Sequence, residues 1–162
     1  MAYVFRLAKG EEIDSVFSLF EKRIEWMNQK NIQQWNVTDY LTVYPKSYYQ
    51  EQQALGNLYV LVDNIIAGAV VLLRSDERWS DRINSSAFYV HNLVTDPVIK
   101  GIGKLLLAEV ENIAKLHGKR CVRLDCAVDN AVLNDYYASA GYELAGKCQD
   151  GPYIGNRREK KL

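Results

Sequence analysis

The chain has 162 residues, of which 48% are hydrophobic, and its 20 basic residues balance its 20 acidic residues. This length suits one domain with a proper core, so we expect residues 1–162 to form a single domain. Zero net charge disfavours a nucleic-acid partner or an anionic membrane. Three cysteines, whose spacing fits no zinc site, indicate a reducing compartment. With no stretch of ~20 apolar residues, we expect a soluble cytoplasmic protein. We also expect no metal.

The first third of the chain reads as a short strand followed by helices. Residues 3–7 alternate in hydrophobicity, which predicts a strand. Residues 13–27 place apolar side chains at helical spacing and predict an amphipathic helix. Residues 28–56 are less regular, with a second, short helix expected to begin at Pro45 and end at Gly56.

A hairpin is expected next. Residues 58–62 and 65–73 are apolar and rich in branched side chains, and the Asp63-Asn64 pair between them predicts a tight turn. The polar residues 74–86 predict a loop, and residues 87–94 predict another strand. The second strand of the hairpin is the more apolar and is expected to be central in the sheet.

Two glycines, Gly101 and Gly103, separate this strand from an amphipathic helix that ends at Gly118. Residues 121–127 then predict a further strand. Strand, helix and strand at this spacing predict a parallel, right-handed crossover unit.

The last part of the chain predicts one more helix and two strands. Asp129 or Asn130 caps the helix, which ends at Gly141. Residues 142–148 and 153–160 predict the final strands, and the basic side chains of the last strand are expected on a solvated sheet edge. These are Arg157, Arg158, Lys160 and Lys161. The order of elements predicts an α/β protein with a mixed sheet.

The turn around Gly101 and Gly103 predicts a site for an anionic group. Glycines let a ligand approach the main chain, and the first N–H groups of the following helix lack intrahelical partners. A mononucleotide P-loop is excluded because Leu105, not Ser or Thr, follows Lys104. A dinucleotide fold is disfavoured because it needs a third glycine where Leu106 stands.

A third class of phosphate-binding protein fits the spacing of the two glycines and of the residues that follow them. The residues that carry the resemblance are Gly101-Ile102-Gly103 after a strand ending at Val94, then Asn130, Tyr137 and Gly141-Tyr142. In these residues, and most clearly over residues 88–144, the chain resembles the GNAT superfamily of acyl-CoA-dependent N-acetyltransferases. The resemblance implies a mixed six- to seven-stranded sheet, splayed between strands 4 and 5, with about four helices. It also implies an acyltransferase that moves an acetyl group from acetyl-CoA to a primary amine of a small molecule or peptide.

The resemblance further implies which residues bind the coenzyme. The strand end would contact the pantetheine arm, the glycine turn would surround the pyrophosphate, and Asn130 would lie near the pantetheine. These residues are Leu93, Val94, Ile99, Lys100, Gly101, Ile102, Gly103, Lys104, Leu105, Asn130 and Tyr137. The first position of the family pattern Gln/Arg-x-x-Gly-x-Gly/Ala falls on Val98, whose side chain cannot bond to phosphate. Main-chain N–H groups, with Lys100 or Lys104 nearby, are expected to serve instead.

Tyr137 takes the family's general-acid position, where a phenol protonates the leaving thiolate. Tyr137 also lies on the apolar face of its helix, as a core residue would. Tyr136 is the alternative general acid if the alignment with the family is shifted by one residue. His91 is chemically suited to take the proton of the acceptor amine, directly or through water, although a packed histidine fits the strand equally. Asp125 and Glu143 are further candidates for the base.

Four aromatic residues, Trp35, Tyr44, Tyr48 and Trp79, are expected to wall an acceptor pocket or, alternatively, to pack the helices on the sheet. Cys126 has no histidine at a matched spacing and is expected to fill the core. The rival function is a non-catalytic acyl-CoA-binding or interaction module with the same fold. Sheet edges or helices could also support a homodimer, which the sequence does not distinguish from a monomer.

Overall fold

The computed structural model describes residues 2–82 and 86–162 and contains a seven-stranded sheet. Hydrogen bonds join the strands in the order β1 (Val4–Leu7), β2 (Leu58–Val62), β3 (Ile66–Leu73), β4 (Ala87–Thr95), β5 (Cys121–Ala127), β7 (Tyr153–Lys161) and β6 (Glu143–Asp150). The pair β4–β5 is parallel, whereas β1–β2, β2–β3, β5–β7 and β6–β7 are antiparallel. The predicted mixed α/β sheet is therefore confirmed. Positions 83–85 of the predicted loop 74–86 lie outside the described residues.

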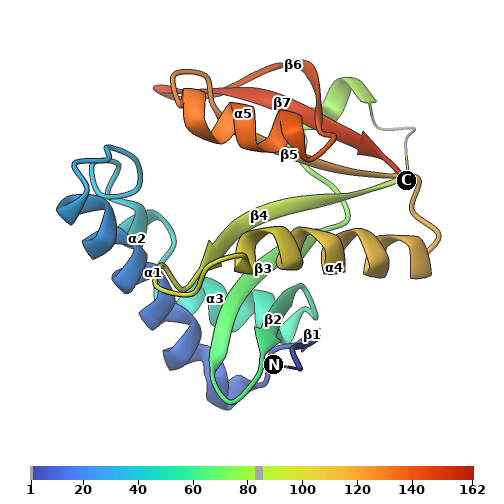
Figure 1. Ribbon diagram of the computed structural model, residues 1–162. Helices are drawn as coiled ribbons and strands as arrows, with labels where there is room; N and C mark the ends of the chain where they lie inside the picture. The colour runs from blue at the N-terminus through green and yellow to red at the C-terminus, as the bar shows by residue number, and fades with distance from the viewer. Residues whose placement is uncertain (1, 83–85) are drawn as a thin grey trace. The chain divides into compact units, whose positions relative to one another are not determined.

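The described residues form two compact units, and the strands β3 and β4 and the helix α4 (Ile102–Leu116) each contribute to both. The first unit comprises the described residues of Met1–Val71 and Asn92–Glu109, and the second those of Leu72–His91 and Val110–Leu162. Figure 1 labels the α-helices and β-strands of the two units. The single-domain organisation stays a prediction.

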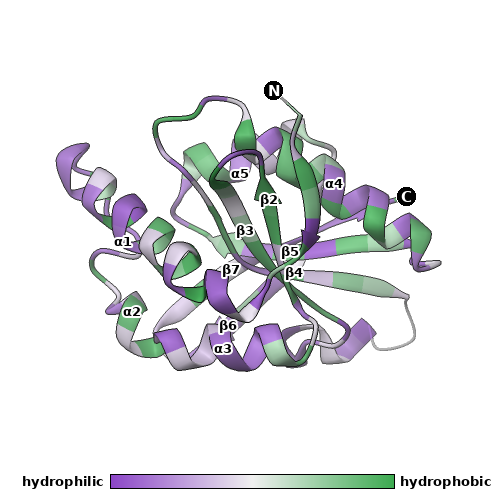
Figure 2. Cartoon of the chain, turned by 90° about the horizontal axis from the view of Figure 1, so that it is seen from below, coloured by the Kyte–Doolittle hydropathy of each residue, from purple (hydrophilic) through white to green (hydrophobic). Residues whose placement is uncertain are grey.

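The first unit packs helices against the amino-terminal strands. Its elements are β1 (Val4–Leu7), η1 (Gly10–Glu12), α1 (Ile13–Gln29), α2 (Tyr40–Val43), α3 (Lys46–Ala54), β2 (Leu58–Val62), most of β3 (Ile66–Leu73), the end of β4 (Ala87–Thr95) and the start of α4 (Ile102–Leu116). Val16 and Phe20 of α1 and Val60 and Val70 of the strands are fully buried. In Figure 2 the strands β2 and β3 are predominantly green, whereas α1 and α3 carry much purple. The predicted helix and hairpin are confirmed, and the short α2 is an addition to them.

Gly68 of β3 lets α4 approach the sheet within the first unit. A Cβ at this position would lie 3.3 Å from Leu106 Cδ2 and 3.4 Å from Ile102 Cγ2, both on α4. It would also lie 3.3 Å from the carbonyl oxygen of Val94. The absence of a side chain at Gly68 therefore sets how closely the beginning of α4 packs on β3 and β4.

The second unit holds the remaining elements around a core of its own. They are η2 (Glu77–Arg82), the start of β4, the end of α4, β5 (Cys121–Ala127), α5 (Ala131–Ser139), β6 (Glu143–Asp150) and β7 (Tyr153–Lys161). Trp79 of η2 is buried together with Tyr89 of β4, Cys121 of β5 and Ala145 of β6. The segment η2 was predicted as loop, and Trp79 anchors it in this core.

The prediction that the last strand lies on a solvated edge is wrong. β7 pairs with β5 along Cys121–Ala127 and with β6 on its other side, so β6 is the edge strand. Arg157 is 8% exposed, and its guanidinium donates to the carboxylate of Asp81 at 2.5 and 3.0 Å. The order of strands along the sequence does not reveal that β7, the second strand of the last hairpin, lies between β5 and β6.

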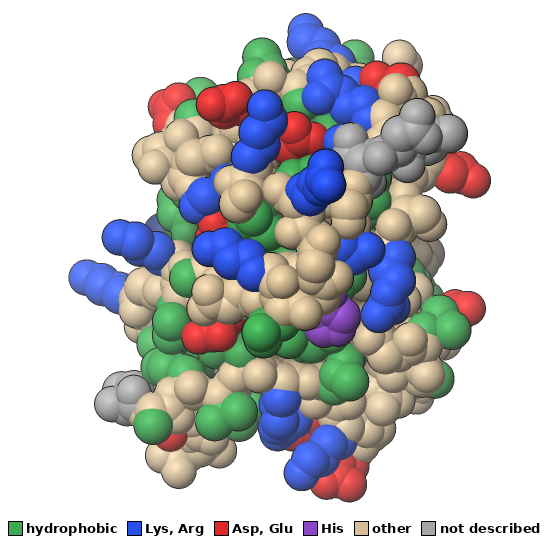
Figure 3. Space-filling model, turned by 90° about the vertical axis from the view of Figure 1, so that its right-hand side faces the viewer, with side chains coloured by type: hydrophobic (Ala, Val, Ile, Leu, Met, Phe, Trp, Pro, Cys, Tyr) green, Lys and Arg blue, Asp and Glu red, His purple; other side chains and the backbone are tan. Residues whose placement is uncertain are grey.

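Charged side chains of both signs are mixed on the molecular face drawn in Figure 3. Among the described residues, no helix has both the length and the hydrophobicity required to cross a membrane. Within the same residues, no three His, Cys, Asp or Glu side chains are grouped so that they could hold a metal ion.

Candidate active site

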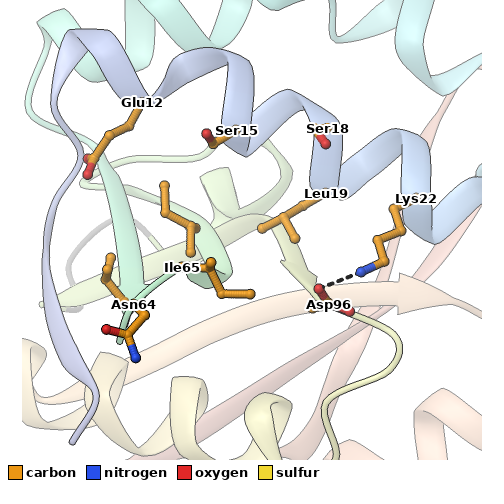
Figure 4. A pocket seen from close by; sticks show the side chains of 10 residues that line it. Glu12, Ser15, Ser18, Leu19, Lys22, Asn64, Ile65 and Asp96 are labelled. Carbon is orange, nitrogen blue, oxygen red and sulfur yellow. Dashed lines mark hydrogen bonds and ion pairs between the residues drawn. The ribbon is translucent and has the colours of Figure 1, made fainter.

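The turn between β4 and α4 is held by Asp96 in the first unit. The Asp96 carboxylate accepts the N–H of Val98 at 3.0 Å and pairs with the Lys22 ammonium at 2.7 Å (Figure 4). Its own N–H donates to the carbonyl of Ala67 at 2.8 Å. Burial alone would raise the pKa of Asp96, but Lys22 and the Val98 N–H hold it below its ordinary value. The carboxylate therefore fixes the start of the turn in its charged form.

The glycine turn itself is open and leads directly into α4. Gly101 has a φ of +82°, and nothing lies within 4 Å of the position that a Cβ would take. The helix begins at Ile102, and the Leu105 N–H donates to the Gly101 carbonyl at 3.2 Å. The N–H groups of the first three helical residues, 102–104, precede this bond and have no intrahelical acceptor, so they can bind an anion that approaches over Gly101. Val98 is 72% exposed and offers no hydrogen bond from its side chain.

Asn92, which was not predicted as a site residue, is the unusual residue of β4. Its φ is +50°, so the extended conformation that underlies the predicted alternation of β4 side chains is interrupted here. Its Nδ2 donates to the hydroxyl oxygen of Tyr40 at 2.6 Å, and its Oδ1 accepts the hydroxyl of Tyr48 at 2.8 Å. Asn is among the residues that tolerate this conformation, but an isolated Asn in an apolar strand carries no signal for it.

The aromatic residues of the first unit form a connected cluster. The rings of Trp35 and Tyr40 stack at 4.4 Å, Tyr40 lies 4.9 Å from Tyr44, and Tyr44 lies 4.9 Å from Tyr48. Three of the four residues predicted to wall an acceptor pocket are thus brought together through Tyr40. Trp79, the fourth, belongs to the second unit, where it is 1% exposed and lies beneath the guanidinium of Arg123.

Leu93 and Val94, which were predicted to contact the coenzyme, lie at the carboxyl end of β4 in the first unit. Val94 is 1% exposed, and Leu93 is half-buried. The Val94 side chain is therefore part of the core, and only its main chain can meet a ligand.

The helix α5 presents Tyr137 in the second unit. Asn130 caps this helix, since its Oδ1 accepts the N–H of Leu133 at 3.0 Å. Tyr137 is 8% exposed, and burial, followed by the neighbouring Cys126, raises the pKa of its phenol above the ordinary value. The phenol therefore keeps its proton at neutral pH. Tyr136, the rival, is 38% exposed.

Asn134 joins α5 to the strands below it and was not predicted from the sequence. Its Nδ2 donates to the carbonyls of Ala127 and Asn130 at 2.9 Å each. Its Oδ1 accepts from Asn156 Nδ2 at 2.9 Å and from Arg158 Nε at 3.2 Å. One residue thereby fixes the start of the helix that carries Tyr137. Because these two partners lie 22 and 24 residues further along the chain, no local sequence pattern predicts the role of Asn134.

The ladder between β4 and β5 is short. It comprises Ala87–Tyr89 of β4 and Cys121–Arg123 of β5, although both strands continue further. His91 lies two residues beyond the last paired residue of β4, within the second unit. Its Nε2 lies 2.7 Å from Asp76 Oδ2, and the two side chains are 16% and 8% exposed. Burial alone would raise the pKa of Asp76, but His91 and the Arg78 N–H lower it.

The other candidates for a base are engaged in other contacts or exposed to solvent. Asp125 of β5 accepts the hydroxyl of Tyr153 at 2.6 Å and pairs with Arg78 at 3.2 Å. Glu143 is exposed at the start of β6. Burial raises the pKa of the Cys126 thiol to about 11, so this cysteine is no ready nucleophile.

A hollow of about 420 Å³ lies between α1 and the β2–β3 turn of the first unit (Figure 4). Ser15, Ser18 and Asn64 are among the described residues that line it, and the sequence predicted none of its lining residues as a site. Its charged lining residues are already paired, Lys22 with Asp96 and Glu12 with Arg6.

The predicted residues thus fall into two groups. The first unit holds the glycine turn, the end of β4 and the aromatic cluster, whereas the second holds His91, Asn130 and Tyr137. The fold, a mixed sheet with a short ladder between the parallel strands β4 and β5 and a glycine turn after β4, is similar to the folds of solved acetyltransferases. The sequence profile of the acetyltransferase (GNAT) family matches residues 22–142, and the chain belongs to this family.

Individual relatives agree with this assignment. The chain is 24% identical over 153 residues to the uncharacterized N-acetyltransferase YesJ of Bacillus subtilis, covering 89% of this chain and 83% of that one. Its fold is similar to a GNAT acetyltransferase of Listeria monocytogenes, with a TM-score of 0.82, 21% identity and coverage of 99% and 95%. It is also similar to the PaiA N-acetyltransferase of Thermoplasma acidophilum, solved in complex with coenzyme A, with a TM-score of 0.76, 19% identity and complete coverage of both chains (100% each).

Proposed function

We propose that the protein transfers an acetyl group from acetyl-CoA to a primary amine by direct attack, with Tyr137 as the general acid. The observation that carries the proposal is the buried phenol of Tyr137, whose raised pKa keeps its proton until a thiolate forms beside it. Tyr137 stands seven residues after the cap Asn130, which is the spacing of the family resemblance. The names of the relatives support an acetyl group as the one transferred.

The glycine turn suits the diphosphate of a coenzyme. The open space over Gly101 and the unpaired N–H groups at the start of α4 support this assignment. Lys100 and Lys104, both at the turn, would add positive charge where Val98 adds none. The coenzyme, when bound, supplies the acetyl thioester, and the chain supplies its positioning and the proton transfers.

The acceptor is proposed to be an amine held by the aromatic cluster. Trp35, Tyr44 and Tyr48 offer ring faces that attract a cation, whereas the burial of Trp79 removes it from this role. All three cysteines, Cys121, Cys126 and Cys148, are free and buried, which supports a cytoplasmic location.

The second candidate, a non-catalytic acyl-CoA-binding module, is favoured by one observation. Val98 is 72% exposed at the position where the family pattern has a polar side chain, so phosphate binding rests on the main chain. Both candidates bind the coenzyme, and they differ in turnover.

Turnover is tested by thiol release from acetyl-CoA in the presence of polyamines, aminoglycosides, amino acids and peptide amino termini. At least one acceptor is expected to stimulate release, and Tyr137→Phe should lower kcat by roughly 10²–10⁴-fold because the acid is lost. Tyr136→Phe is the matched control on the same helix and should retain kcat within about threefold. Release that no acceptor stimulates, or equal turnover of Tyr137→Phe and wild type, would contradict the proposal.

A further inference from the structure

We infer that Asp76 is a positioning residue that holds the proton of the His91 ring on Nε2 and so leaves Nδ1 as the base for the acceptor ammonium. This inference rests on the proposed transferase function and adds to it the identity of the base and of the residue that orients it. Asp76 lies in a polar segment that the sequence predicted only as a loop.

The contact between the two side chains defines which ring nitrogen carries the proton. Asp76 Oδ2 lies 2.7 Å from His91 Nε2, and this is the hydrogen bond that the described residues make with the ring. Because the pKa of Asp76 is below its ordinary value, its carboxylate is ionised at neutral pH and can only accept. Nε2 therefore donates, and in the neutral ring Nδ1 carries the lone pair.

Asp76 is itself held in place. Its Oδ1 accepts the N–H of Arg78 at 2.9 Å, and its carbonyl accepts the N–H of Trp79 at 2.9 Å. Trp79 is 1% exposed in the core of the second unit, so the turn that carries Asp76 is anchored. Rotation of the carboxylate away from His91 would break the bond to Arg78, which leaves Oδ2 aimed at the ring.

The contacts around His91 favour it as the base over the carboxylates of Asp125 and Asp150. It lies just beyond Tyr89, the last residue of β4 that pairs with β5. Asp125 is already committed to Arg78 and Tyr153, and Asp150 pairs with the same Arg78 at 3.0 Å. His91 thus has an available nitrogen that these groups lack.

The proton transfers then balance. His91 Nδ1 takes one proton from the acceptor ammonium, directly or through one water, and the Asp76 carboxylate offsets the charge of the imidazolium. The amine nitrogen bonds to the thioester carbonyl carbon, and the C–S bond breaks with its electron pair on sulfur. Tyr137 gives its proton to that sulfur and recovers one, through solvent, from the amide nitrogen. His91 returns its proton to solvent.

Two substitutions of Asp76 separate positioning from a structural role. In Asp76→Asn the amide oxygen stays with the Arg78 N–H, which turns the amide NH₂ toward His91 Nε2 and forces the ring proton onto Nδ1. In Asp76→Ala no side chain at position 76 fixes the ring proton, so through exchange with water the proton can occupy either Nδ1 or Nε2. We therefore expect kcat to fall by roughly 10²–10³-fold in Asp76→Asn but by only about tenfold in Asp76→Ala, with the acceptor KM changed by less than about threefold.

The reverse order, in which the nearly isosteric Asp76→Asn is the more active of the two, would overturn the inference. A purely structural Asp76 gives that order, because the alanine loses both hydrogen bonds. Thermal unfolding of both variants shows whether each is folded at the assay temperature.

A spectroscopic measurement tests the inference without turnover. Long-range ¹H–¹⁵N NMR of protein labelled at histidine, at a pH where both rings are neutral, reports the tautomer of each. His117 is an internal reference, since its Nδ1 lies 2.9 Å from the carbonyl of Ile113 and must carry the proton. His91 is expected to show the Nε2–H form in wild type and the Nδ1–H form in Asp76→Asn.

An Nδ1–H form of His91 in wild type, or a spectrum that Asp76→Asn leaves unchanged, would overturn the assignment of Asp76. If instead the tautomers are as expected but no acceptor is acetylated, the proposed function fails while the orientation of His91 stands. If the tautomers and the order of the Asp76 variants are as expected, His91→Gln should lose kcat at least as strongly as Asp76→Asn.

Discussion

Asn134 uses both ends of its amide to fix α5 in the second unit. Its NH₂ group satisfies two main-chain carbonyls, and its oxygen accepts from two side chains of β7. The residue is 8% exposed, so none of these partners is easily replaced by water. The placement of Tyr137, one turn further along the helix, depends on this amide.

Asn134→Ala is therefore expected to lower the free energy of unfolding by about 1–3 kcal/mol, because it removes the hydrogen bonds of a buried amide and leaves Asn156 Nδ2 and Arg158 Nε without this acceptor. Urea unfolding measures the loss. Asp135→Ala, on the exposed neighbour in α5, is the matched control and should change stability by less than about 0.5 kcal/mol. Equal effects of the two substitutions would show that the amide network does not hold the helix.

Residues whose roles follow from local spacing were found in the sequence, and residues with distant partners were not. Asp129 or Asn130 was predicted to cap α5, and the bond from the Leu133 N–H to Asn130 Oδ1 shows that Asn130 is the cap. Asn134, Asp76 and Asn92 act through partners brought near by the fold, such as Tyr40, which is 52 residues before Asn92. No periodicity in one sequence reports such contacts.

At the scale of elements, the turn after β4 depends on a charge pair in the first unit. Asp96 is 4% exposed, and its carboxylate bonds to Lys22 and to the Val98 N–H. Its lowered pKa means that folding favours the ionised form. The stability gained is present above the pKa of the unfolded chain, about 3.9, and is lost as the pH falls through the folded value.

Asp96→Asn should consequently be less stable than wild type by about 1–3 kcal/mol at pH 7, and the difference should shrink as the pH falls below about 4. Urea unfolding at several pH values between 7 and 3.5 measures it. Lys22→Met, which removes the partner, should reduce the same pH dependence. A difference that grows toward low pH would show that Asp96 is not stabilised as a carboxylate.

The strands and helices were predicted best where hydrophobic pattern and turn residues agree. β2 and β5 begin and end where the sequence placed them, at Leu58–Val62 and Cys121–Ala127. The order of strands across the sheet could not be predicted from the sequence, because β7 lies between β5 and β6. The short α2 and η2 were missed since each is held by tertiary contacts, as Trp79 shows for η2.

For the whole molecule, family membership is established by the profile that matches residues 22–142. The family resemblance assigned both the glycine turn and the helix that carries Tyr137 to the coenzyme site. In the structure these two segments belong to different units. The chemistry proposed for the chain requires bound coenzyme A. Binding of that ligand is thus the claim on which the rest depends.

Native mass spectrometry of the purified protein with coenzyme A tests this claim most directly. We expect a complex with one coenzyme per chain, and Gly101→Val should weaken it markedly, because a branched side chain is strained at a φ of +82° and covers the main-chain N–H groups. Val98→Ala, at an exposed residue of the same turn, should bind like wild type. If no complex forms at a large excess of coenzyme A, both the transferase and the non-catalytic binding module are excluded.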